Sequence, residues 1–281
     1  EGLATSIFLA LRLERPLLLE GEPGVGKTEV ARVLADWVGG PLVRLQCYEG
    51  IDAAQAVYEW DHARQLLHLR TAEATGRAVD TTDTALEDEL YDERFLVRRP
   101  LLQAIAAGDG PPPVLLIDEV DRADDEFEAY LLEILADYSV TVPEVGTFRA
   151  ERPPVVIVTS NRTRDVHDAL KRRCLYHWVE HPDPAREVAI IALRAPEVGE
   201  RLARQVAAAT ESIRAVGLYK PPGVAETIDR ARALPLLGDD ELVAEHGEAT
   251  LGTLLKYRED QNRVRAHDLH ALVAGARAAP A

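Results

Sequence analysis

The sequence predicts an α/β fold that begins with a parallel sheet and ends in a small all-α domain. Five short apolar runs alternate with helix-like segments, at residues 17–20, 42–46, 113–118, 154–160 and 175–179. Such alternation is typical of a parallel five-stranded sheet flanked by helices. After the two prolines of the segment 181–186 (HPDPAR), the pattern becomes helical almost throughout. We therefore expect an α/β domain over residues 1–182 and a helical domain over residues 183–281.

The third and fourth runs, PVLLID and PVVIVTS, predict strands buried on both faces, because they are apolar and rich in β-branched residues. Two long detours separate the strands. The first includes residues 75–89, which hold few large apolar side chains and are predicted to form a mobile loop. The second follows a predicted helix near Asp125–Asp137, alternates around residues 140–142 and contains Gly146, which predicts a hairpin.

Composition limits the classes of function. Hydrophobic residues make up 47% and charged residues 28% of the 281 residues, which is ordinary for a globular protein. No run approaches the roughly 18 apolar residues of a transmembrane helix, so we expect a soluble, cytoplasmic protein. A net charge of −16 argues against a general nucleic-acid binder. Cys47 and Cys174 lack metal-ligand spacing, so we expect free, buried thiols rather than a zinc site.

The segment GEPGVGKT at residues 21–28 matches the pattern G-x-x-x-x-G-K-[ST] between a predicted strand and a predicted helix, Lys27–Val38. Its glycines let the backbone curl so that N–H groups point at phosphate oxygens, and the helix start adds positive charge. Lys27 is predicted to reach the β- and γ-phosphates, and Thr28 to bind Mg²⁺. The alternative is a chance glycine turn. The residues predicted to bind the nucleotide are Gly21, Glu22, Pro23, Gly24, Val25, Gly26, Lys27, Thr28 and Glu29.

The segment VLLIDE brings two carboxylates to the end of a predicted buried strand. Asp118 is predicted to hold Mg²⁺ through water, and Glu119 to orient and deprotonate the attacking water. The alternative is an acidic pair that caps the next helix. The Asp-Glu order favours ATP, and the segment NRTRD at residues 161–165 lacks the Lys of the GTPase motif N-K-x-D. We therefore expect ATP and Mg²⁺ as ligands.

Two further positions allow two interpretations each. Asn161 follows the fourth predicted strand, where its amide would either position the attacking water or serve a turn. Arg172 and Arg173 follow Lys171 at a predicted helix end. They are either cations that complement the helix dipole or an arginine finger that enters the ATP site of a neighbouring subunit. The residues alone leave both questions open.

Taken in order, these motifs resemble an AAA+ ATPase over nearly the whole chain. The two detours resemble the inserts of the branch with an extra element in its second helix and a hairpin before the Asn-bearing strand. Within that branch the segments RLQCYEGIDAAQAVYEW, LYDERFLVRRPLLQAI, SNRTRDVHDALKRRCLYHW and LYKPPGVAETIDRARAL resemble MoxR-type ATPases. The resemblance is greatest to the CoxD-like group, which is associated with assembly of molybdenum-containing carbon monoxide dehydrogenase.

The resemblance implies roles for the site residues. GEPGVGKT corresponds to Walker A, LLIDE to Walker B and Asn161 to sensor 1, while Arg173 is the better candidate for the finger, with Arg172 as its neighbour. The family usually has Pro-Arg at the start of a lid helix, where the Arg is sensor 2. This chain has Lys220 followed by two prolines there. Lys220 either substitutes for that Arg or is simply solvated.

The resemblance also implies an assembly and partners. The family forms rings, usually hexamers, with ATP at subunit boundaries. The resemblance further implies a partner with a von Willebrand A domain. The expected function is that of a chaperone-like ATPase that remodels or matures a client metalloenzyme. Tyr58 and Trp60 of the first insert either grip the client or pack the insert onto its own core. The rival function is that of a nucleic-acid motor, against which the charge of −16 counts.

Overall fold

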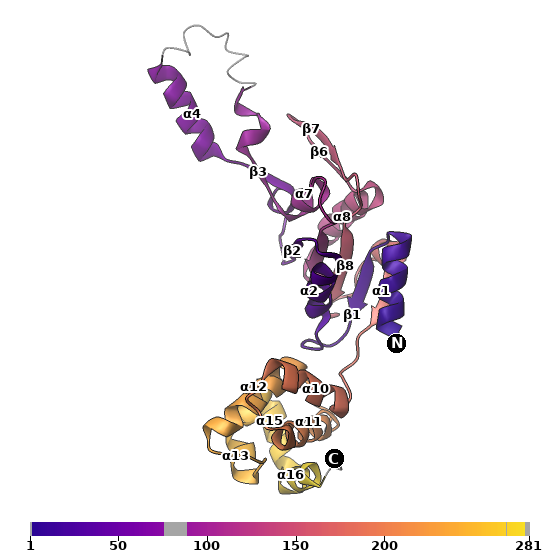
Figure 1. Ribbon diagram of the computed structural model, residues 1–281, viewed down its shortest axis with the longest axis vertical. Helices are drawn as coiled ribbons and strands as arrows, with labels where there is room; N and C mark the ends of the chain where they lie inside the picture. The colour runs from indigo at the N-terminus through magenta and orange to yellow at the C-terminus, as the bar shows by residue number, and fades with distance from the viewer. Residues whose placement is uncertain (1, 76–88, 268, 279–281) are drawn as a thin grey trace. The chain divides into compact units, whose positions relative to one another are not determined.

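A computed structural model of the protein describes residues 2–75, 89–267 and 269–278 (Figure 1). Most of the predicted loop over residues 75–89 lies outside these residues. Contacts group the chain into two units. The first contains Lys27–Trp178 and the residues before Glu22, and the second contains Glu22–Gly26 and the residues from Val179 onward. The domain boundary between residues 182 and 183 stays a prediction.

The first unit contains a five-stranded parallel sheet in the order β2-β5-β8-β1-β9. Its strands are β1 (Leu17–Glu20), β2 (Leu42–Gln46), β5 (Val114–Asp118), β8 (Val155–Ser160) and β9 (Leu175–Trp178). The predicted fold class and all five strands are confirmed, although β9 ends one residue earlier than predicted. β5 and β8 begin one residue later than predicted, after Pro113 and Pro154, because proline has no N–H to donate to a neighbouring strand.

The central strands owe their burial to their sequence. Every residue of β1 and β5 is buried, as are all of β8 except its first residue. Their side chains join those of neighbouring helices in the main core of this unit. Because all five strands are parallel, their carboxyl ends share one edge of the sheet, where Glu20, Gln46, Asp118 and Ser160 lie. The phosphate loop follows Glu20, the Asp-Glu pair begins with Asp118, and Asn161 follows Ser160.

Helices pack against this sheet. They are α1 (Gly2–Leu13), α2 (Lys27–Val38), α7 (Pro100–Ile105), α8 (Asp125–Asp137) and α9 (Asp168–Arg173), with a 3-10 turn η2 (Val120–Arg122) after β5. α2 contacts β2, β5 and β8, whereas α1 contacts β1 and β9. The predicted bounds of α2 are confirmed. It ends before Gly39, whose φ of +71° is the left-handed conformation that glycine adopts readily after a helix.

Two inserts extend from the sheet, in the places the sequence predicted (Figure 1). The first consists of α3 (Ala53–Val57), β3 (Tyr58–Trp60), α4 (His62–Ala74), η1 (Glu93–Phe95) and β4 (Leu96–Arg98). The second is the predicted hairpin, formed by β6 (Ser139–Val142) and β7 (Gly146–Arg149). In the first insert, Tyr58 and Trp60 are half-buried against the main core, and Trp60 meets Tyr91 edge-to-face. This placement matches packing of the insert onto its own core.

The described residues of the second unit from Val179 onward are helical or irregular. Its helices are α10 (Pro184–Arg194), α11 (Glu200–Arg214), α12 (Val224–Leu236), α13 (Ala244–Ala249), α14 (Leu251–Leu254), α15 (Arg258–Ala266) and α16 (Leu269–Arg277). A buried ion pair joins α10 to α11, where Arg214 donates two hydrogen bonds of 2.8 Å to Glu187. No helix in the described part of the chain is long and apolar enough to cross a membrane.

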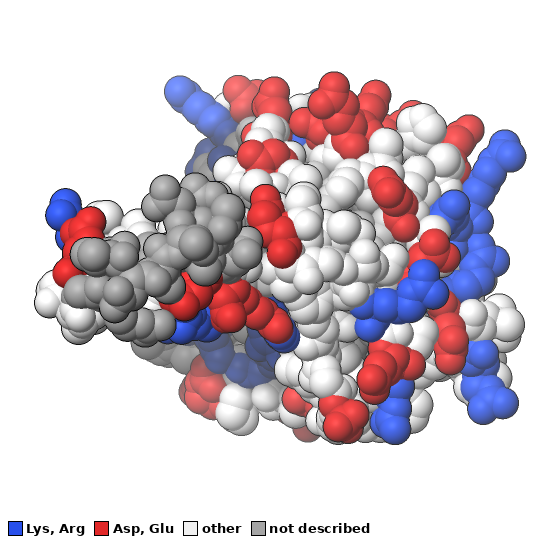
Figure 2. Space-filling model, turned by 90° about the horizontal axis from the view of Figure 1, so that it is seen from above, with Lys and Arg blue, Asp and Glu red and all other residues white. Residues whose placement is uncertain are grey.

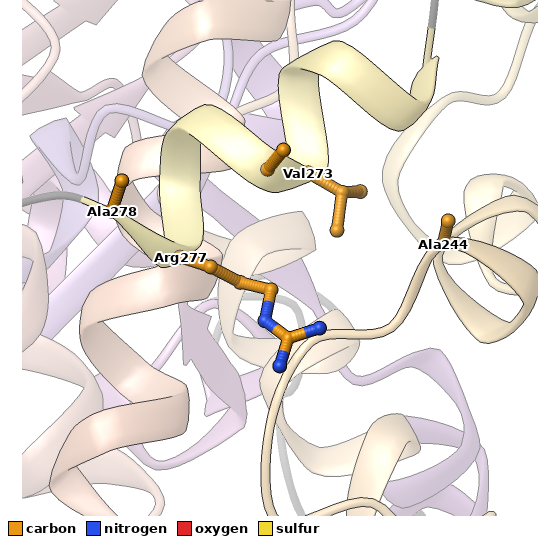
Figure 3. A pocket seen from close by; sticks show the side chains of 5 residues that line it. Ala244, Val273, Arg277 and Ala278 are labelled. Carbon is orange, nitrogen blue, oxygen red and sulfur yellow. The ribbon is translucent and has the colours of Figure 1, made fainter.

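A pocket in the second unit lies beside α16 (Figure 3). Ala244, Val273, Ala274, Arg277 and Ala278 line it. Its one ionisable lining side chain, Arg277, forms an ion pair of 2.5 Å with Glu241. The pocket therefore presents mainly methyl groups, and it contains none of the residues predicted to bind the nucleotide.

Both cysteines are buried and free, as predicted. Burial raises the pKa of Cys47 and of Cys174 to about 12. At pH 8 the thiolate fraction of the native protein is then on the order of 10⁻⁴, against roughly a quarter for an ordinary exposed thiol. We expect both thiols to resist iodoacetamide at pH 8 in the native protein and to react within minutes in urea. Mass spectrometry measures this, and prompt labelling of either cysteine in the native protein would contradict it.

Candidate functional site

The glycine-rich segment 21–28 connects β1 to α2. Gly24 and Gly26 have φ values of +79° and +95°, a region that residues with a side chain rarely adopt. Lys27, the first residue of α2, is only 6% exposed, and its Nζ donates to the carbonyl oxygen of Gly21 at 2.7 Å. The buried amine thus lies against the same loop whose backbone is predicted to hold phosphates. A twelve-residue helix begins there, so its unpaired N–H groups add positive charge.

Asp118 brings α2, β5 and β8 together at the carboxyl edge of the sheet. It ends β5 and is 3% exposed. One carboxylate oxygen, Oδ1, accepts hydrogen bonds from Thr28 Oγ1 at 3.3 Å and from Thr159 Oγ1 at 2.5 Å. The structure therefore places together Thr28 and Asp118, the two predicted magnesium ligands, which are 90 residues apart in the sequence.

The other oxygen of Asp118 is held by an arginine that the sequence analysis did not identify. Arg44 of β2 donates to Asp118 Oδ2 from Nε at 3.1 Å and from Nη2 at 2.6 Å. The register explains the meeting, since Gln46 of β2 lies opposite Asp118 and Arg44 is two residues earlier on the same face. The sequence did contain a sign of this contact, because Arg44 is a charged residue in the middle of the strand LVRLQ.

Glu119 has a left-handed backbone, with φ of 55° and ψ of 50°. Residues other than glycine seldom adopt this conformation, and those that do are concentrated at functional sites. Its N–H donates to Thr159 Oγ1 at 2.9 Å, and its carboxylate forms an ion pair of 2.9 Å with Arg122. Thr159, which the sequence analysis also missed, thus fixes both residues of the Asp-Glu pair from the neighbouring strand.

Asn161 follows β8 and is fixed through its backbone. Its N–H donates to Oδ1 of the buried Asp121 at 3.1 Å. Asp121 Oδ2 accepts from the N–H of Thr163 at 2.8 Å and from its hydroxyl at 2.6 Å. The turn after β5 and the loop after β8 are therefore tied together by Asp121, a third residue that the sequence analysis did not single out.

Arg172 and Arg173 end α9, and both are exposed. Arg15 donates to the Arg172 carbonyl at 2.7 Å and to the Arg173 carbonyl at 3.1 Å, so a third arginine caps this helix end. Arg173 Nη1 donates to the carbonyl of Leu132 in α8 at 3.1 Å. Within the described chain, no hydrogen bond or ion pair joins Arg172 or Arg173 to the group around Asp118.

The donor set at the edge of the sheet fits a magnesium–nucleotide complex better than a metal held by protein ligands alone. In the described ranges, no group of three or more His, Cys, Asp or Glu side chains is placed to hold a metal ion. The hydroxyl of Thr28 and the carboxylate of Asp118 each offer an oxygen that can bind a metal ion. Mg²⁺ commonly binds one or two such protein ligands and completes its shell with water and phosphate oxygens.

The AAA domain (dynein-related subfamily) family matches residues 16–174, which is more than half of the chain and includes β1, α2, β5 and β8. An uncharacterized protein of Staphylococcus epidermidis is 24% identical over 262 residues, covering 91% of this chain and 89% of that protein. A segment of midasin from Giardia intestinalis is 47% identical over 49 residues, which is 17% of this chain and 1% of midasin.

A solved structure, the RuvB Holliday junction branch migration motor of Thermotoga maritima, has a TM-score of 0.47 and 14% identity, over 90% of this chain and 66% of that one. The chain thus spans only part of midasin and about two thirds of RuvB. The match to the family, together with the strand order and the phosphate loop, identifies this chain as a member of the AAA domain family, in its dynein-related subfamily, and as an ATPase.

Proposed function

We propose that this ATPase binds ATP with Mg²⁺ at the carboxyl edge of its sheet and is a MoxR-type ring chaperone of the CoxD-like group. The proposed task is to remodel or mature a client metalloenzyme, of molybdenum hydroxylase or carbon monoxide dehydrogenase type. One observation carries the nucleotide site: Thr28, in the first turn of the helix that follows the phosphate loop, donates a hydrogen bond to Asp118 at the end of β5, 90 residues away in the sequence. The client rests on the sequence resemblance alone.

The residues divide the chemistry among themselves. The backbone N–H groups of residues 21–28 and the Lys27 amine would bind the phosphates, after Lys27 turns away from the Gly21 carbonyl. Thr28 and Asp118 would hold Mg²⁺, which when bound neutralises charge on the phosphate oxygens. Glu119 would leave Arg122 and take a proton from the attacking water.

Asn161 is proposed to orient that water through its side-chain amide. Its backbone is held by Asp121, so the amide extends from a fixed point of the chain. Because the amide is neutral, it does not compete for the metal as a carboxylate would. Residues 183–281 are proposed to form the lid domain, which moves against residues 1–182 as nucleotide is bound and released. These roles complete the assignment that the sequence motifs suggested.

An arginine finger is proposed at the end of α9. We expect Arg173→Ala to lower turnover by about 10³-fold or more with nucleotide affinity unchanged, because a finger stabilises charge that develops at the γ-phosphate. Arg172→Ala is the matched control and is expected to cost less than about 10-fold. Steady-state ATPase assays with a fluorescent-nucleotide titration measure both effects. A larger loss for Arg172→Ala would reverse the assignment of the two residues.

The assembly and the partners are tested with a nucleotide-locked variant. Glu119→Gln is expected to hold ATP, to form rings visible by mass photometry, and to retain a von Willebrand A domain protein and a molybdenum hydroxylase subunit from native extract. Lys27→Met, which is expected not to hold ATP, is the control bait. If both baits retain the same proteins, the partners do not depend on the ATP state and the proposed function fails.

The same experiment tests the rival function. Retention of nucleic acid and replication proteins by Glu119→Gln would favour a motor that acts on nucleic acid. The surface charge argues against that outcome. Figure 2 shows acidic side chains all around the face drawn, a largely uncharged area in its middle, and basic side chains gathered mainly toward the right with acidic side chains among them. The net charge of −16 has the same consequence, since phosphate backbones attract lysine and arginine.

A further inference from the structure

We propose that Arg44 is a positioning residue for the magnesium site: it holds the Asp118 carboxylate so that Oδ1 faces the Thr28 hydroxyl. The proposal rests on the proposed nucleotide site and deepens it. Arg44 belongs to neither nucleotide motif and lies on β2, at the edge of the sheet. We infer this role from the way in which the hydrogen-bond donors are divided between the two oxygens of the buried Asp118 carboxylate.

Each oxygen of Asp118 has its own set of donors. Oδ1 accepts from the hydroxyls of Thr28 and Thr159, at 3.3 Å and 2.5 Å. Oδ2 accepts from Nε and Nη2 of Arg44, at 3.1 Å and 2.6 Å. Each carboxylate oxygen thus accepts two hydrogen bonds. Rotation of the carboxylate plane would break hydrogen bonds on both sides at once.

The charge of Asp118 also depends on Arg44. The Asp118 side chain is 5% exposed, and a buried charge without a partner is costly. Glu119, the next acidic side chain along the chain, is paired with its own arginine, Arg122. Arg44 supplies a positive charge next to the Asp118 carboxylate, in an ion pair of 2.6 Å.

The position of Arg44 suits a residue that supports a metal site without blocking it. Its side chain is 53% exposed, so the guanidinium reaches inward from the edge strand while remaining partly solvated. Nη2 also donates to Gln46 of the same strand, which anchors the group a second time. Since Arg44 binds Oδ2, it leaves Oδ1 beside the Thr28 hydroxyl, and those two oxygens are the proposed metal ligands.

A lysine at this position is expected to be inferior. The guanidinium of Arg44 uses Nε and Nη2 on one carboxylate oxygen and shares Nη2 with Gln46, an arrangement that needs a planar, forked donor. An ammonium group keeps the charge but lacks that fixed geometry. The two variants Arg44→Lys and Arg44→Gln therefore separate the effect of charge from the effect of orientation.

The test measures the Mg²⁺ dependence of nucleotide binding by the full chain. A fluorescent ATP analogue carrying a methylanthraniloyl group is titrated in EDTA and then at increasing Mg²⁺. We expect the half-saturating Mg²⁺ concentration to rise by about 10-fold or more in Arg44→Gln, and by a smaller factor in Arg44→Lys, as for other groups that orient a metal ligand. In EDTA, the affinity of both Arg44 variants for the analogue is expected to stay within about two-fold of the affinity of the unchanged protein, because the phosphate loop is intact.

Arg70→Gln is the matched control, since Arg70 is exposed on α4 and, among the described residues, forms an ion pair of 3.4 Å with its neighbour Glu73. If the unchanged protein binds the analogue without any Mg²⁺ dependence, the proposed nucleotide site fails. If that dependence is present and both Arg44 variants behave as Arg70→Gln does, the inference about Arg44 is overturned. Loss of binding in EDTA as well would also overturn it, because Arg44 would then support the loop itself. If Arg44→Gln does not fold, the Mg²⁺ dependence of Arg44→Lys is compared with that of Arg70→Gln instead, and an equal dependence overturns the inference.

Discussion

Replacement of Glu119 by Gln is expected to lower ATP turnover by about 10²–10⁴-fold, the usual worth of a general base. Nucleotide binding is expected to persist, because the phosphate loop, Lys27 and Asp118 are unchanged. Gln has nearly the shape of Glu, so the left-handed backbone at φ 55° and the hydrogen bond from its N–H to Thr159 are retained. What is lost is the carboxylate that pairs with Arg122 and that would accept the proton.

Steady-state phosphate release and a fluorescent-nucleotide titration measure the two quantities separately. Glu126→Gln is the matched control, since Glu126 is an exposed acidic residue in the first turn of α8 and undergoes the same chemical change. We expect Glu126→Gln to turn over ATP at the unchanged rate. Normal turnover by Glu119→Gln would exclude Glu119 as the base and direct attention to another carboxylate.

Replacement of Lys27 by Met is expected to abolish tight nucleotide binding. Lys27 is 6% exposed and is proposed to pair with the phosphates of ATP. Removal of one member of a buried, hydrogen-bonded charge pair typically costs about 2–5 kcal/mol, which corresponds to roughly 30- to 5,000-fold in affinity. Met is unbranched and of similar length, so it fills the space that the lysine stem occupies. The hydrogen bond from Nζ to the Gly21 carbonyl is lost as well.

The Lys27→Met experiment needs a check on folding, since the substitution lies in the first turn of α2. Hydrogen exchange of the α2 and β5 amides provides it, and we expect protection within the normal range. Lys256→Met is the matched control, because Lys256 is exposed in the second unit and its hydrogen bonds within the described ranges go to the nearby carbonyls of Gly252 and Thr253. If Lys27→Met binds the nucleotide with unchanged affinity, Lys27 is not a nucleotide-binding residue.

Much of the first unit was predictable because its signals are local. The strands β5 and β8 are recognisable in the sequence as mainly apolar runs. A strand that is buried on both faces has no solvent-facing side, so polar residues do not alternate with apolar ones. The helix α2 has a glycine-rich start and a glycine stop, and the hairpin of β6 and β7 has its Gly146 at a φ of +125°. In each case a few neighbouring residues determine the backbone.

Other elements gave weaker signals. α1 was not predicted, because Gly2–Leu13 carries exposed apolar residues such as Phe8 and Leu13 that blur its period. The short strands β3 and β4 were also missed. They are three residues each and pair with one another across the first insert, so their stability depends on partners distant in sequence. Tertiary packing, rather than local preference, forms these elements.

By itself the sequence determined the family, the sheet, the phosphate loop and the Asp-Glu pair, because each is encoded in a contiguous stretch whose backbone or burial follows from its own residues. Only the tertiary structure decided which side chains surround that pair. Arg44 and Thr159 reach Asp118 because β2 and β8 lie on either side of β5, an order that depends on long-range pairing. Strand order and register have no local code, so the partners of a buried carboxylate become known only when the sheet is assembled.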